Sequence, residues 1–210
     1  MIKRQIVLAS TNKTKIQRLT WIINGLALYP LLPDNITLNP ILEETGTSHS
    51  ENAEIKSNAW SQATNYLSIA TDGGLFIPAL GSTWDSINTK RFAGPNATDQ
   101  DRIAHLLMLM KPYSSKDRHA FWIEALSLSW RGRTLATWEV HGEPGTLRTS
   151  VGKDSALDGF WADTLWHPSN QNSLKVKQDT TDETFGSHWI QLKDRFHDFY
   201  RNMLNLPAEQ

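Results

Sequence analysis

The sequence predicts an α/β fold around a mixed β-sheet. Strand-like and helix-like patterns both occur along the whole chain, and they do not follow the regular strand–helix–strand alternation of a doubly wound parallel sheet. The 210 residues suffice for one sizeable domain, or for one domain with two lobes. Hydrophobic residues make up 39% of the chain and charged residues 20%, which is typical of globular proteins.

The N-terminal half carries clear strand and helix signals. Ile16, Leu19 and Ile23 recur with the spacing of a buried helix face, and Ser48 with Glu51 has the spacing of a capping box. In chain order we expect a strand at residues 5–9, a helix to about residue 24, a short strand at 36–38, a helix from about 50 to 64, and a strand at 67–71 that bends at 72–74 and resumes over 75–77.

The C-terminal half begins with residues 81–98, which hold few periodic apolar positions and are expected to form a surface loop. Thr98 then has the position of a helix N-cap, because an apolar stripe with helical spacing follows it. Further elements are expected in this order: strands at 118–130 and 134–141 joined by a hairpin turn at 131–133, and a final helix from about residue 187.

Charge and cysteine content exclude several classes of protein. The net charge of −1 gives no global field that would attract nucleic acid or an anionic membrane. The chain has no cysteine, which excludes disulfides, thiolate metal sites and cysteine nucleophiles and suits a cytoplasmic protein. The longest apolar segment, residues 19–32, is interrupted by Asn24, Gly25 and Pro30 and is shorter than the roughly 20 residues that span a bilayer. We therefore expect a soluble protein without a nucleic-acid or membrane partner.

A strand-to-helix turn supplies the first candidate site. Its sequence is STNKTK, with Ser10, Thr11, Asn12, Lys13 and Lys15 as candidate phosphate-binding residues. Hydroxyls, helix N–H groups and ammonium groups at such a turn favour a bound polyphosphate. The alternative is an ordinary helix cap with solvated lysines, and the pattern is not that of a P-loop.

Two further candidates follow along the chain. Glu51 and Lys56 lie one turn apart on the expected second helix, where the alternative roles are a capping residue and a surface lysine. Asp72 ends an apolar strand beside Gly73. A carboxylate in that position suits a metal ion or an activated water, and the alternative is an ordinary Asp-Gly turn.

The last candidate is split between two segments. Phe160 and Asp163 fall in the sequence GFWAD, and Ser187 and His188 precede Trp189. An aromatic ring and a carboxylate suit stacking on a nucleobase and recognition of a ring N–H. The alternative is a loop aromatic followed by a helix N-cap at Ser187.

The order and spacing of these segments resemble the inosine/xanthosine triphosphate pyrophosphatase family, the Ham1-like enzymes that act on non-canonical purine nucleotides. The resemblance covers nearly the whole chain and is most specific from residue 6 to about residue 110. The matching segments are, in order, STNKTK at residues 10–15, EETG at 43–46, ENAEIK at 51–56, TDGGL at 71–75, TKRFAG at 89–94, ATD at 97–99, GFWADT at 159–164 and SHW at 187–189.

The resemblance implies a two-lobed α/β fold around a long mixed sheet, with flanking helices and the active cleft between the lobes, in a single domain over residues 1–210 that forms a homodimer. It implies hydrolysis of a nucleoside triphosphate to a monophosphate and pyrophosphate with Mg²⁺ as cofactor. Lys13 and Lys56 would hold phosphates, Glu51 and Asp72 would position the metal, and Asp72 would activate the water. Further substrate-binding positions implied by the family pattern are Ser10, Thr11, Asn12, Lys15, Gly73, Arg91 and Ser187, with Phe160 stacking on the base and Asp163 and His188 reading its edge.

The chain departs from the family pattern beside the catalytic centre and around the base. Thr71 and Gly73 replace an Asp and a Ser of the family's DDSG segment, and Trp189 and Glu183 replace an Arg and a Lys. We therefore expect pyrophosphohydrolase chemistry with an altered base preference. Two alternatives are a nucleotide-binding protein of the same fold that has lost catalysis, with a sensor or regulatory role, and an enzyme that hydrolyses a different phosphorylated substrate.

Overall fold

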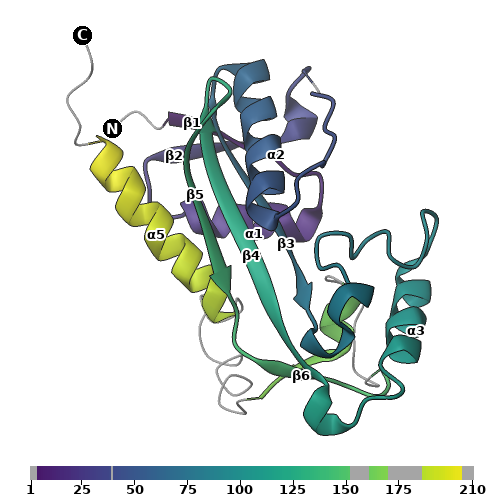
Figure 1. The fold of residues 1–210 in the computed structure, drawn as a ribbon. Helices are drawn as coiled ribbons and strands as arrows, with labels where there is room; N and C mark the ends of the chain where they lie inside the picture. The colour runs from purple at the N-terminus through teal and green to yellow at the C-terminus, as the bar shows by residue number, and fades with distance from the viewer. Residues whose placement is uncertain (1–3, 39, 152–160, 170–185, 205–210) are drawn as a thin grey trace. The chain divides into compact units, whose positions relative to one another are not determined.

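The computed structural model describes residues 4–38, 40–151, 161–169 and 186–204 (Figure 1). The chain forms two compact units. The first consists of Met1–Asp72, Glu124–Val140 and Ser187–Gln210, and the second of Gly73–Ile123 and His141–Gly186. Two long strands, β3 (Leu67–Phe76) and β4 (His119–Trp130), contribute to both units.

The first unit holds most of the longer helices. Its remaining elements are β1 (Arg4–Leu8), α1 (Lys13–Ile23), β2 (Leu28–Leu31), the 3-10 helix η1 (Pro33–Asn35), α2 (His49–Thr64), β5 (Arg133–His141) and α5 (Ser187–Leu204). The remaining elements of the second unit are η2 (Pro78–Thr83), α3 (Asp99–Leu109), η3 (Ser115–Asp117), β6 (Gly145–Leu147), η4 (Trp161–Thr164) and β7 (Trp166–Pro168). Among the described helices, none is long and apolar enough to cross a lipid bilayer.

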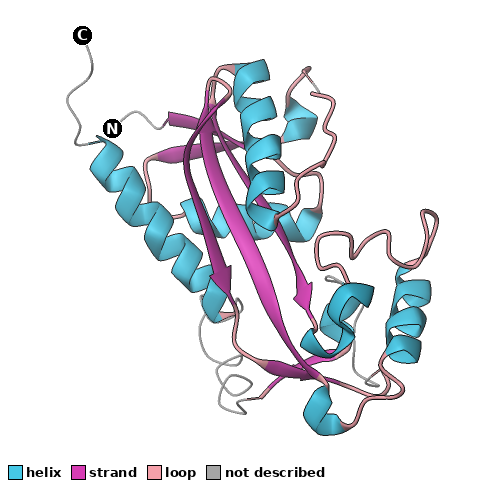
Figure 2. Cartoon of the chain, in the orientation of Figure 1, coloured by secondary structure: helices cyan, strands magenta, loops and turns pink. Residues whose placement is uncertain are grey.

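The strands form one seven-stranded mixed sheet, coloured magenta in Figure 2. The hydrogen-bonded order is β2-β1-β3-β4-β6-β7, and β5 pairs with β4. Strand β1 runs parallel to both β2 and β3, whereas β6 is antiparallel to β4 and to β7. The predicted α/β fold with a mixed sheet is therefore confirmed.

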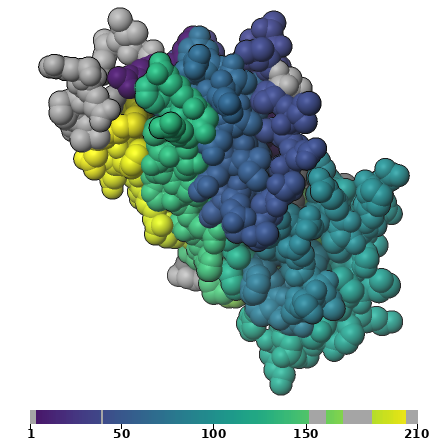
Figure 3. All heavy atoms as spheres, turned by 45° about the horizontal axis from the view of Figure 1, so that its top comes forward, coloured from purple at the N-terminus to yellow at the C-terminus, as the bar shows by residue number. Residues whose placement is uncertain are grey.

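Helices α2 and α5 cover opposite faces of the β4–β5 hairpin in the first unit. The Thr137 hydroxyl on β5 donates to Glu54 of α2 (2.7 Å), whereas the neighbouring Trp138 ring packs edge-on against Phe196 and Phe199 of α5. Because successive side chains of a strand point to opposite faces, this alternation places one helix on each side. The space-filling view agrees, with the green hairpin between blue α2 and yellow α5 (Figure 3).

Each unit has its own apolar core. In the first unit α1 packs against α5, and both helices carry fully buried side chains, namely Leu19, Ile22, Trp189, Leu192, Phe196 and Tyr200. The second unit is built around a cluster on β3, η2, α3 and η4, with Leu75, Leu80, Trp84, Ile103, Leu106, Met110 and Trp161 among its members. Trp84 lies within the expected surface loop, so that segment contributes to the core although it has little apolar periodicity.

Helix caps and the hairpin turn follow the predictions. The Ser48 hydroxyl accepts the N–H of Glu51 at the start of α2, and Thr98 with Asp101 forms a complete capping box on α3. The hairpin turn has positive φ at Arg131 (50°) and Gly132 (73°), the backbone that a tight two-residue hairpin requires.

Two expected strands were wrong in detail. Residues 36–38 form no strand, and the neighbour of β1 is β2, at Leu28–Leu31. Pro30 is tolerated within β2 because this strand lies at the sheet edge, where a missing N–H need not be paired. The expected bend at residues 72–74 is also absent. Strand β3 instead runs without interruption from Leu67 to Phe76, through both glycines.

Candidate active site

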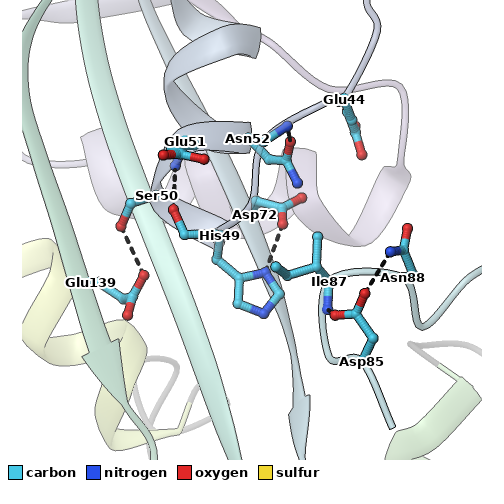
Figure 4. A network of polar contacts seen from close by, with 12 residues as sticks. Glu44, His49, Ser50, Glu51, Asn52, Asp72, Asp85, Ile87, Asn88 and Glu139 are labelled. Atoms are coloured by element: carbon cyan, nitrogen blue, oxygen red, sulfur yellow. Dashed lines mark hydrogen bonds and ion pairs between the residues drawn. The ribbon is translucent and has the colours of Figure 1, made fainter. Parts of the chain in front are cut away.

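The Asp72 carboxylate is the centre of a buried polar cluster in the first unit (Figure 4). The Lys56 ammonium donates to its Oδ1 at 2.7 Å, and the Nδ1–H of His49 donates to its Oδ2 at 2.7 Å. The Lys15 ammonium lies 3.9 Å from Oδ1. One carboxylate is thus surrounded by two ammonium groups and one imidazole.

Three elements bring these residues together. Asp72 lies on β3, and Lys15 lies in the first turn of α1, which follows the neighbouring strand β1. His49 and Lys56 are two turns apart on α2, so their side chains share one helix face. Lys56 and Asp72 were predicted site residues, and the structure joins them directly.

The surroundings of Asp72 favour its charged form. Burial by itself raises the pKa of this carboxyl, but the His49 hydrogen bond and the charges of Lys56 and Lys15 outweigh burial and lower the pKa to about 2. Burial and the charge of Lys56 lower the pKa of Lys15, whereas Glu124 and Asp72 oppose that change. The cluster therefore holds an ionised carboxylate at neutral pH.

Glu124 is a second acid in this cluster, and it was not predicted. It lies on β4 with 4% of its surface exposed, and its Oε1 has no hydrogen-bond partner among the described residues. Burial raises its pKa, an effect that Lys15 and Arg18 counteract. The sequence signal was a single acid in an otherwise uncharged strand, which is unusual because charged residues are rarely fully buried.

Two acids near the start of α2 have different surroundings. Glu44 Oε1 lies 3.5 Å from the Lys56 ammonium, so Lys56 bridges Glu44 and Asp72. The Glu51 carboxylate instead accepts hydrogen bonds from the Thr47 N–H (2.6 Å) and hydroxyl (2.8 Å). Glu44 belongs to the EETG segment but was not predicted as a site residue.

The predicted phosphate turn caps α1. Asn12 is the N-cap, its Oδ1 accepts the N–H of Lys15 (3.1 Å), and its own N–H donates to the Ser10 hydroxyl (3.2 Å). Thr11 and Lys13 are exposed beside it. Of the two lysines in this turn, Lys15 is therefore the one that reaches Asp72.

The start of α5 carries Ser187 and His188, which are both half-buried, and the buried Trp189. Burial and the nearby charge of Arg18 lower the pKa of His188 to about 4, so its imidazole is neutral at pH 7. The Arg18 guanidinium lies over the Trp189 ring, 4.9 Å from its centroid. Arg18 was another residue that the sequence did not indicate.

The other predicted residues belong to the second unit. Gly73 is a half-buried strand residue on β3, Arg91 is exposed in a turn that precedes α3, and Asp163 is exposed on η4. Phe160 and Glu183 lie outside the described residues.

Comparison with known proteins identifies the family. The Ham1 family model matches residues 6–154, which is well over half of the chain. The chain belongs to the Ham1 family. A dITP/XTP pyrophosphatase from Coxiella burnetii is 30% identical to this Ham1 protein over 186 residues, which cover 88% of this chain and 90% of that enzyme. A dITP/XTP pyrophosphatase from Legionella pneumophila is 32% identical over 168 residues, 78% of this chain and 81% of that enzyme.

Solved Ham1 structures have the same fold. A HAM1 protein from Coxiella burnetii superposes with a TM-score of 0.75 at 26% identity, covering 93% of this Ham1 chain and 99% of that one. The Ham1 protein of Staphylococcus aureus gives a TM-score of 0.72 at 26% identity, covering 94% and 100%. The predicted family membership is thereby confirmed.

Proposed function

We propose that this Ham1 protein is a nucleoside-triphosphate pyrophosphohydrolase that acts on non-canonical purine nucleotides. The observation that carries the proposal is the Asp72 cluster, in which two ammonium groups and a buried carboxylate lie together in a chain of this family. Phosphoryl transfer depends on positioning and charge neutralisation more than on covalent assistance from the protein. The naming of curated relatives as dITP/XTP pyrophosphatases supports the same reaction.

In this proposal Lys15 and Lys56 neutralise phosphate oxygens, and Asp72 orients the attacking water. A water oxygen bonds to the α-phosphorus, the bond to the bridging oxygen breaks, pyrophosphate leaves, and the water proton passes to solvent. A carboxylate with a pKa of about 2 is a weak proton acceptor at neutral pH. Asp72 would therefore act by accepting a hydrogen bond from the water.

The acids of the cluster fit a magnesium ion. Mg²⁺ is commonly bound by one or two carboxylates together with substrate phosphates and several waters. Asp72 and Glu44 both lie beside the Lys56 ammonium, at 2.7 and 3.5 Å, and are the two candidate carboxylate ligands. Within the described residues no group of three or more acidic, His or Cys side chains forms a metal cage, so the phosphates would complete the site. The ion would supply further charge neutralisation, and Glu51 remains a candidate ligand.

The proposal is tested by measuring pyrophosphate release from a panel of canonical and deaminated triphosphates with Mg²⁺. We expect release from inosine and xanthosine triphosphates that exceeds an Asp72→Asn control by at least about 100-fold, because the variant loses a charged group at the reacting centre. Equal release from the wild type and the variant would refute the proposal.

Loss of catalysis is the second candidate, because both Asp72 oxygens already accept hydrogen bonds from the protein. Triphosphates would bind to such a protein and raise its melting temperature, but they would not be hydrolysed. Measuring pyrophosphate release and melting temperature on one sample separates the two candidates.

We further propose that the protein is a homodimer. Support comes from three apolar side chains near the EETG segment, since Leu38, Ile41 and Leu42 are 52%, 91% and 36% exposed. Light scattering over a concentration series should give twice the chain mass, and a monomer at all concentrations would contradict this.

A further inference from the structure

Arg18 and Trp189 form a contact that the proposed chemistry does not use. Arg18 follows Lys15 by one turn of α1, so the two cations lie on one face of the helix. Its guanidinium lies over the Trp189 ring of α5, with 4.9 Å between the guanidinium carbon and the ring centroid. The indole face attracts a guanidinium in this position and restrains it.

The hydrogen-bonding capacity around this contact is not satisfied within the described part of the chain. Arg18 Nε, Trp189 Nε1 and Glu124 Oε1 are all buried without a hydrogen-bond partner there. Buried polar atoms are normally paired, so each such atom requires a physical reason. A ring contact does not replace the five hydrogen bonds that a guanidinium can donate.

The charge at this point is permanent, and it belongs to Arg18 alone. His188 is neutral at pH 7, because burial and Arg18 lower its pKa to about 4, and Trp189 carries no charge. Arg18 is only half-buried, in contrast to Glu124, so part of this residue remains exposed. Its donors match oxygen acceptors, which in a nucleotide are phosphate oxygens and base carbonyls.

We propose that Arg18, oriented by Trp189, is a substrate-binding residue that donates hydrogen bonds to an oxygen of the nucleotide on the nucleoside side of the phosphates held by Lys15. The inference rests on the proposed function. The oxygen is either a base carbonyl, which makes Arg18 a determinant of base preference, or an α-phosphate oxygen, which makes it a general nucleotide contact.

The chain offers a matched control for this residue. Lys193 of α5 lies over the Trp21 ring of α1 at 4.0 Å, so it is a second cation stacked on an indole between the same two helices. Arg18→Met and Lys193→Met each remove one stacked cation and keep an unbranched apolar chain. Melting temperatures of both variants report the structural cost alone.

The experiment measures kcat/KM for inosine, adenosine and uridine triphosphates, and the Kd of each nucleotide by calorimetry. Arg18→Met is expected to lower kcat/KM by about 10- to 100-fold, the usual effect of losing a charge-assisted hydrogen bond, with Lys193→Met within about threefold of the wild type. Arg18→Lys should recover part of the loss. Inhibition by tripolyphosphate, which lacks a nucleoside, should be equal in the wild type and Arg18→Met if Arg18 binds a base carbonyl, and weaker in Arg18→Met if it binds the α-phosphate.

Each outcome decides a separate point. A loss for inosine triphosphate that spares adenosine triphosphate, whose base has no carbonyl, assigns a base carbonyl, and an equal loss for all three nucleotides assigns the α-phosphate. An Arg18→Met variant that matches Lys193→Met in kcat/KM and Kd overturns the inference, while an active wild type would leave the proposed function intact. If the wild type binds nucleotide without turnover, the proposed function fails and the Kd values alone test Arg18. If Arg18→Met has a lower melting temperature than Lys193→Met, Arg18→Lys replaces it in the comparison.

Discussion

Lys15 shows how side-chain direction separates two lysines that look equivalent in sequence. Both lysines of the STNKTK turn are cations at a helix start, but Lys13 is exposed and Lys15 lies 3.9 Å from Asp72. Positions two apart on a helix differ by about 200° in direction, so only one can face the neighbouring strand. Burial and the charge of Lys56 lower the pKa of Lys15, and a bound phosphate would counteract both effects.

We predict that Lys15→Met and Lys13→Met differ in activity. Lys15→Met should lower kcat/KM for inosine triphosphate by at least about 10-fold, because it removes a partly desolvated charge beside Asp72. Lys13→Met should stay within about threefold, since an exposed charge is screened by water and salt. Steady-state kinetics on the two variants provides the measurement, and a larger loss for Lys13→Met would contradict this assignment.

His49 and Glu124 mark the limit of what the sequence alone predicted at the residue scale. His49 is adjacent to the predicted cap of α2, but its contact with Asp72 joins residues 23 positions apart and depends on how α2 packs against β3. Glu124 lies on a strand that reaches this cluster only through the sheet order. Single residues within predicted elements were therefore missed, whereas Lys56 and Asp72 were found because their segments match a family pattern.

At the scale of elements, local hydrogen bonds hold the start of α2 in place. Ser48 caps the helix, and the N–H of Gly46 donates to Asn52 Oδ1 at 2.9 Å, which ties the EETG segment to the first turn. The capping signal was visible in the sequence because it depends on residues three positions apart. The need for a glycine at position 46 was not visible in the sequence, because it arises from the close approach of the EETG segment to α2.

Gly46→Ala is predicted to destabilise this junction. The added Cβ would lie 2.7 Å from Asn52 Oδ1 and 2.8 Å from Glu51 Cβ, so the segment that carries Glu44 must move. We expect a loss of about 1–3 kcal/mol in the free energy of unfolding, the usual range for overpacking. Urea denaturation measures it, and the exposed neighbour Thr45→Ala serves as the control. Equal midpoints for the two variants would show that the segment relaxes without cost.

For the whole molecule, the mixed sheet was predictable and its short strands were not. The patterns of β1, β3, β4 and β5 are long enough to show periodicity, and their combination with helices excluded a doubly wound sheet. Strands β6 and β7 have three residues each, too few for any alternation to appear. The position of β2 likewise depends on pairing with β1, a contact that no local pattern encodes.

Glu124 gives the stability of the whole molecule a specific dependence on pH. Its pKa in the folded state is raised above the ordinary 4.5 by burial. Below pH 4.5 the carboxyl is protonated in both states and has little differential effect. As the pH rises above 4.5, the unfolded chain releases the proton while the folded protein retains it, so this group stabilises the folded state progressively less until its raised pKa is passed.

We therefore predict that Glu124→Gln stabilises the protein, and that its advantage over the wild type grows as the pH rises above about 4.5. The amide removes the titration and keeps the shape, and the growth is limited to about 1.4 kcal/mol per pH unit because one proton is involved. Urea denaturation from pH 4 to pH 8 measures the difference, with Glu43→Gln as a control at an exposed glutamate. Lys15 and Arg18 act in the opposite direction on Glu124. If they outweighed burial, the variant would lose stability with rising pH, and that sign would show that Glu124 is held as a stabilising carboxylate within the cluster.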